Sequence, residues 1–175
     1  QSPAAATAPP PRVPELAELI PLATAVSGRL ASLERASADG VDVPRVEKQL
    51  ADISARVDEY AEQFLALQTA TGPQAGRLPQ LKAEIKRAGD ALAGVSKFVK
   101  EKVRTLGNLR KAWLAEQQQW NAWQAALLQD EPLEHITTTV TRTKGAIETA
   151  LGLLRQQLRP LLAIQEHAGT LHTRI

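Results

Sequence analysis

Residues on one apolar face recur every three or four positions over most of the chain, and this spacing constrains the fold more than any other feature. It is unbroken at Val46, Leu50, Ile53, Val57, Tyr60, Phe64 and Leu67. Such spacing places these side chains along one face of an α-helix. Because the residues between them are mostly charged or polar, the opposite face is expected to face solvent. The segment therefore predicts an amphipathic helix that packs on other helices.

Three further segments show the same spacing. Their apolar faces are formed by Leu16, Leu19, Ala23, Val26, Leu30 and Leu33; by Leu81, Ile85, Ala88, Leu92, Val95, Val99, Val103 and Leu106; and by Ile136, Val140, Thr143, Ile147, Leu151, Leu154, Leu158 and Leu161. Glycine and proline residues separate the segments, because both residue types interrupt or end helices. We therefore predict helices over about 15–38, 44–71, 79–129 and 132–175. A kink or break is expected at Pro160.

The fold class follows from these helices. No segment shows the alternation of a β-strand, and only 3% of the residues are aromatic, which disfavours a β-sandwich or barrel. The links at 39–43 and 130–131 are short, so consecutive helices should run antiparallel. We predict an all-α protein, an elongated antiparallel helical bundle or set of coiled-coil hairpins with three to four long helices. Residues 15–175 are expected to form a single helical domain.

Residues 1–14 differ in composition from the rest of the chain. They contain five of the eleven prolines, and alanine and threonine fill much of the remainder. Such a segment buries too little apolar area to offset the entropy lost on ordering, so we predict a disordered Ala/Pro-rich lead-in. It also resembles the start of an exported chain after removal of a signal peptide.

No arrangement of residues predicts catalysis or metal binding. The chain has no cysteine, which excludes a thiol nucleophile, a disulfide or a zinc–thiolate site. His167 and His172 are five positions apart and point in different directions on a helix. Asp39 and Asp42 resemble part of a calcium loop that lacks its other oxygen ligands, so a turn with a helix cap is the favoured interpretation. We expect no catalytic residue, no cofactor and no metal.

Three tryptophans form the most distinctive local pattern. Trp113 and Trp120 are one heptad apart, and Trp123 follows three residues later, so all three lie on or beside one helix face. Amid glutamine and asparagine they could form a docking platform for a carbohydrate or a protein partner. The alternative, which we favour, is that they pack inside a helical bundle.

A basic stretch from Lys97 to Lys111 contains six cations against Glu101 alone. Lys97, Lys100 and Arg104 share one helix face opposite the apolar one, and form a candidate electrostatic contact surface. The simpler interpretation is the solvent face of an amphipathic helix. The net charge of +2 and the presence of a single aromatic residue in this stretch, Phe98, disfavour nucleic acid as a partner.

The segment Leu109–Gln117, with Trp120, Trp123 and Leu151–Leu158, resembles the N-terminal extracytoplasmic helical region of large bacterial mechanosensitive channels of the small-conductance (MscS-like) family. The resemblance implies a non-catalytic, periplasmic helical domain of a bacterial inner-membrane protein. It would act in subunit association or in coupling the ion channel to an envelope partner. Membrane contact would then be made by segments outside this chain.

Two other functions remain open. A ligand-sensing helical bundle of a chemoreceptor or sensor kinase needs inward-facing polar side chains, and the obvious supply is Thr137, Thr138, Thr139, Thr141 and Thr143. A coiled-coil adaptor of an envelope assembly would instead dock through the helix-connecting tip at 129–133.

Overall fold

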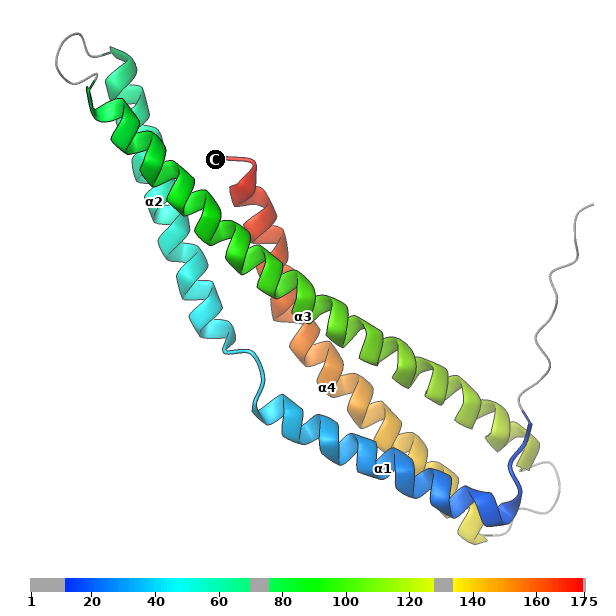
Figure 1. The fold of residues 1–175 in the computed structure, drawn as a ribbon. Helices are drawn as coiled ribbons and strands as arrows, with labels where there is room; N and C mark the ends of the chain where they lie inside the picture. Colours follow the sequence, from blue (N-terminus) through cyan, green and yellow to red (C-terminus); the bar gives the residue numbers. More distant parts are fainter. Residues whose placement is uncertain (1–11, 70–75, 128–133, 175) are drawn as a thin grey trace, which may run out of the picture. The chain divides into compact units, whose positions relative to one another are not determined.

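The computed structural model describes residues 12–69, 76–127 and 134–174, which form four helices (Figure 1). These are α1 (Leu16–Ala38), α2 (Val43–Thr69), α3 (Leu78–Leu127) and α4 (Glu134–His172). No strand occurs within the described residues. The all-α prediction is confirmed. The predicted ends at 71, 129 and 175 and the predicted start at 132 lie outside the described residues.

Helix α4 continues through Pro160, where a kink or break was expected. Proline lacks a backbone N–H and therefore removes the hydrogen bond to the carbonyl four residues earlier. Leu158, Leu161 and Ile164 on either side are all buried. Packing of these side chains stabilises the helical path across the missing bond.

The chain divides into two compact units, whereas the sequence predicted a single helical domain over 15–175. Unit 1 comprises Gln1–Asp39 and Leu109–Leu154, and unit 2 comprises Gly40–Asn108 and Arg155–Ile175. The long helices α3 and α4 contribute residues to both units. The shorter helices do not, because α1 belongs wholly to unit 1 and α2 wholly to unit 2.

Unit 1 is a three-helix arrangement of α1 with the second part of α3 and the first part of α4. Its buried side chains come from all three helices: Leu19, Val26, Leu33, Trp113, Trp120, Trp123, Ile136, Val140, Thr143, Ile147, Ala150, Leu151 and Leu154. The hydroxyl of Thr143 donates to the carbonyl of Thr139, 2.8 Å away, so this buried polar group is satisfied.

Unit 2 combines α2 with the first part of α3 and the second part of α4. Its core contains Val46, Leu50, Ile53, Val57, Ala88, Leu92, Val99, Leu161, Ile164, Ala168 and Leu171. Asp42 precedes α2, and its Oδ1 accepts the Arg45 N–H at 3.1 Å. This bond is the helix cap favoured for the 39–42 turn.

A search of the described helices for a stretch long and apolar enough to cross a membrane finds none.

Candidate functional site

The three tryptophans lie inside unit 1. Trp113 and Trp123 are each 5% exposed and Trp120 is 0% exposed. The rings of Trp120 and Trp123 meet edge to face, with centroids 5.3 Å apart. Rings enclosed to this degree offer almost no surface to a partner. The tryptophans are core residues, as in the packing interpretation, and not the docking platform that their spacing also allowed.

A polar network surrounds these rings and links α1 to α3. The Arg29 guanidinium lies over the Trp113 ring, with Cζ 5.3 Å from its centroid. The same guanidinium donates to Oε2 of Glu116 at 2.6 Å. The other oxygen of Glu116 accepts the Trp120 indole N–H at 3.0 Å. The buried indole N–H of Trp120 thus has an acceptor, which is the usual condition for burying tryptophan.

Residues 12–14, the last three of the predicted lead-in, pack on unit 1. The Trp123 indole N–H donates to the Arg12 carbonyl at 3.0 Å, and Pro14 is buried. Arg12 also pairs with Glu15 at 3.5 Å and with Glu18 at 3.9 Å. A buried indole N–H requires an acceptor, and the Arg12 carbonyl supplies it, so these three residues of the lead-in have defined contacts in the structure. Residues 1–11 lie outside the described residues.

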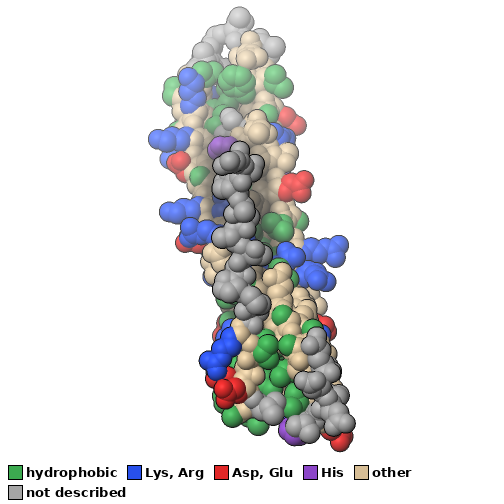
Figure 2. Space-filling model, turned by 90° about the vertical axis from the view of Figure 1, so that its right-hand side faces the viewer, with side chains coloured by type: hydrophobic (Ala, Val, Ile, Leu, Met, Phe, Trp, Pro, Cys, Tyr) green, Lys and Arg blue, Asp and Glu red, His purple; other side chains and the backbone are tan. Residues whose placement is uncertain are grey.

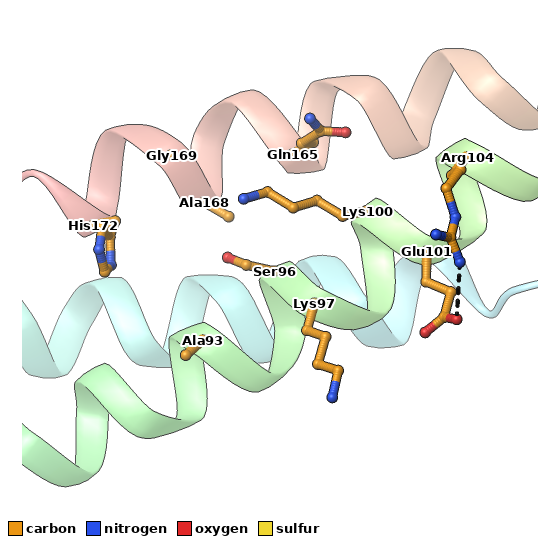
Figure 3. Close-up of a pocket in the computed structure, with 10 residues that line it drawn as sticks. All are labelled: Ala93, Ser96, Lys97, Lys100, Glu101, Arg104, Gln165, Ala168, Gly169 and His172. Atoms are coloured by element: carbon orange, nitrogen blue, oxygen red, sulfur yellow. Dashed lines mark hydrogen bonds and ion pairs between the residues drawn. The ribbon is translucent and has the colours of Figure 1, made fainter. Parts of the chain in front are cut away.

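The three basic candidates line a groove in unit 2. Lys97, Lys100 and Arg104 contribute from α3, and Gln165, Gly169 and His172 contribute from α4 (Figure 3). We call this cavity, of about 660 Å³, the basic groove. Ala93, Ser96, Glu101 and Ala168 complete its lining.

The side chains of the basic groove point in different directions. Figure 3 shows Lys100 and Ser96 reaching from α3 toward Ala168 on α4, whereas Lys97 points away from α4. The Arg104 guanidinium turns toward Glu101, with an N–O distance of 3.5 Å. The ammonium group of Lys100 thus lies between α3 and α4, and Lys97 and Arg104 precede and follow it along α3.

The groove carries more positive than negative charge. Its lining has three cations against the single carboxylate of Glu101, which pairs with Arg104. Over the described parts of the chain, no acidic side chain forms an ion pair with Lys97 or Lys100. Uncompensated cations beside a concave surface attract and orient anionic groups. The groove is therefore suited to carboxylates or other anions.

Gln165 adds an unsatisfied hydrogen-bond acceptor. Its Oε1 is buried and has no hydrogen-bond partner among the described residues. A buried carbonyl without a donor is destabilising by about 1–3 kcal/mol. Rotation of the side chain into the groove would expose this oxygen to a donor on a ligand. A molecule that brought both an anionic group and an N–H or O–H to this point would satisfy both features of the site.

The sequence predicted only the α3 side of this groove. Lys97, Lys100 and Arg104 stood out because one short stretch contains them. The α4 residues Gln165, Gly169 and His172 were missed. Each of them comes one residue after a buried position of α4, namely Ile164, Ala168 or Leu171. This row of residues beside the buried face of α4 was the sequence signal that could have identified them.

Three of the five threonines proposed for a ligand-sensing pocket use their hydroxyls within their own helix. The hydroxyls of Thr138, Thr139 and Thr143 donate to carbonyls four residues earlier in α4. They therefore satisfy their own helix, as threonine commonly does. The tip proposed for a coiled-coil adaptor, 129–133, lies outside the described residues.

No group of three or more acidic or histidine side chains in the described segments is placed to hold a metal ion. Comparisons with protein-family models, with curated proteins and with solved structures find no match for this chain.

Proposed function

We propose that this chain is a non-catalytic docking domain that binds an acidic segment of a partner protein in the basic groove. The observation that carries the proposal is that Lys97, Lys100 and Arg104 all line one cavity, whose lining contains a single carboxylate. Carboxylates of a partner would pair with these cations.

A peptide fits the groove better than free phosphate does, because the unpaired oxygen of Gln165 needs a hydrogen-bond donor. Gln165 offers a buried carbonyl oxygen that needs a donor. A peptide supplies a backbone N–H beside its carboxylates, whereas an ionised phosphate has only acceptors. The small residues Ala93, Ala168 and Gly169 leave room for a backbone to approach.

We further propose that the domain belongs to the periplasmic part of an MscS-like mechanosensitive channel in a bacterial inner membrane. The support is the resemblance carried by Leu109–Gln117, Trp120, Trp123 and Leu151–Leu158. In that setting the acidic segment would come from a neighbouring channel subunit or from an envelope protein. Membrane fractionation of the full gene product tests this assignment to a membrane channel. A product that alkaline carbonate extracts from the membrane fraction would contradict it.

Binding of an acidic peptide tests the docking proposal. The probe is a rhodamine-labelled peptide of about twelve residues rich in glutamate, and its companion carries glutamine in place of every glutamate. Combined Lys97→Gln, Lys100→Gln and Arg104→Gln should weaken binding of the acidic probe about tenfold or more, because three attractive charges are lost. Fluorescence anisotropy at low and at moderate salt measures the effect.

The matched control changes three cations of the same basic stretch that do not line the groove. Combined Lys102→Gln, Arg110→Gln and Lys111→Gln alters net charge equally and should change the affinity by less than about twofold. Equal weakening by both triple variants would show attraction to net charge alone and would overturn the proposal. So would equal binding of the glutamine companion peptide.

A further inference from the structure

An apolar groove lies in unit 2 between α2 and α3, next to the end of α4. We call it the α2–α3 groove. It has a volume of about 470 Å³ and is lined by Val57, Tyr60, Ala61, Phe64, Leu65, Ile85, Ala88 and Arg174. Figure 2 shows hydrophobic side chains between the flanking helices at the α2–α3 end of the molecule. Phe64, on the predicted apolar face of its segment, is 39% exposed.

Helix α4 already occupies the adjoining part of the same α2–α3 pair. Leu161, Ile164, Ala168 and Leu171 of α4 belong to the core cluster that also contains residues of α2 and α3. Helix α4 ends at His172, and the Arg174 guanidinium then pairs with Asp58 of α2. The α2–α3 groove therefore continues an established interface of unit 2, one in which the third partner is a single amphipathic helix.

The flanks of the groove carry opposite charges. On α2, Asp58 and Glu62 are four residues apart and lie beside the lining residues Ala61 and Leu65. On α3, Lys82 and Lys86 are likewise four apart and lie beside Ile85. All four charged residues are exposed. Because Asp58 already pairs with Arg174, Glu62 is the α2 carboxylate that a partner can engage. A helix that fits here needs a basic residue beside Glu62 and acidic residues beside Lys82 and Lys86.

We propose that the α2–α3 groove binds an amphipathic helix of a partner protein, in the manner in which α4 packs on the adjoining part. The bound helix presents an apolar stripe of three- and four-residue spacing between a basic and an acidic flank. A second copy of this chain is a poorer fit. Its α2–α3 pair would present two helices side by side, whereas the adjoining part of the interface accommodates a single helix, α4. This surface is separate from the basic groove and does not depend on its function.

A designed peptide tests this inference. The probe is a labelled helix of about 21 residues with a leucine stripe, lysines on one flank and glutamates on the other; its companion has serine in place of each leucine. Phe64→Asp should weaken binding of the leucine peptide about tenfold or more, because a charge then lies in an apolar contact. Phe64→Ala should weaken it less, in the same direction.

Phe98→Asp is the matched control, since Phe98 is 44% exposed on α3 of the same unit and does not line the groove. It should alter peptide affinity by less than about twofold. Circular dichroism is used to check that each variant remains folded. Equal weakening by Phe64→Asp and Phe98→Asp, or equal binding of the serine companion, would overturn the inference. So would a dimer of the chain, detected by analytical ultracentrifugation, that Phe64→Asp dissociates, because a second copy would then occupy the groove.

Discussion

Trp120→Ala is expected to lower the free energy of unfolding by about 3–5 kcal/mol, the largest single effect in unit 1. The ring is fully buried and meets Trp123 edge to face. Truncation leaves a large cavity among the helices, and it also removes the indole N–H that donates to Glu116. Since Glu116 holds Arg29 over Trp113, the loss weakens the link between α1 and α3.

Urea unfolding followed by circular dichroism measures this effect. Leu114→Ala is the control, because Leu114 is on the same helix and 37% exposed, and it should cost about 1 kcal/mol or less. Trp120→Ala should leave the affinity for the acidic peptide unchanged while the protein is folded, because the ring lies in unit 1 and the basic groove in unit 2. Equal destabilisation by both variants would contradict a core role for Trp120.

Leu92→Ala is expected to lower the free energy of unfolding by about 2–5 kcal/mol through a cavity in unit 2. Leu92 is fully buried in the cluster that joins α2, α3 and α4. Leu162→Ala removes the same atoms from a side chain that is 49% exposed, so it should cost about 1 kcal/mol or less. Thermal and urea unfolding of the two variants provide the comparison. A smaller loss for Leu92→Ala than for Leu162→Ala would be incompatible with the packing described for unit 2.

The sequence predicted the helices and their buried faces well where a third helix covers them. All eight residues named for the apolar face of the last segment, from Ile136 to Leu161, are buried. In α2, Val46, Leu50, Ile53 and Val57 of the apolar face are buried, but Tyr60, Phe64 and Leu67 are partly or largely exposed. Spacing within one segment shows which face is apolar. It does not show how far along that face another helix extends.

Contacts between segments far apart in the sequence could not be predicted from the spacing of apolar residues. The division into two units depends on which parts of α3 and α4 contact α1 and which contact α2. The apolar spacing within one segment does not predict these contacts. Gln165 and His172 join the basic groove because of the register between α3 and α4. The Arg12 carbonyl is likewise paired with Trp123, 111 positions away.

The most direct test of the proposed docking function is nuclear magnetic resonance of the isotopically labelled chain, titrated with the glutamate-rich peptide. We predict that backbone amide shifts concentrate at 93–104 and 165–172, the two segments that line the basic groove. The Gln165 side-chain amide should shift with them, because its carbonyl acquires a donor. Shifts centred on α1, or spread evenly over the exposed lysines and arginines, would contradict the account.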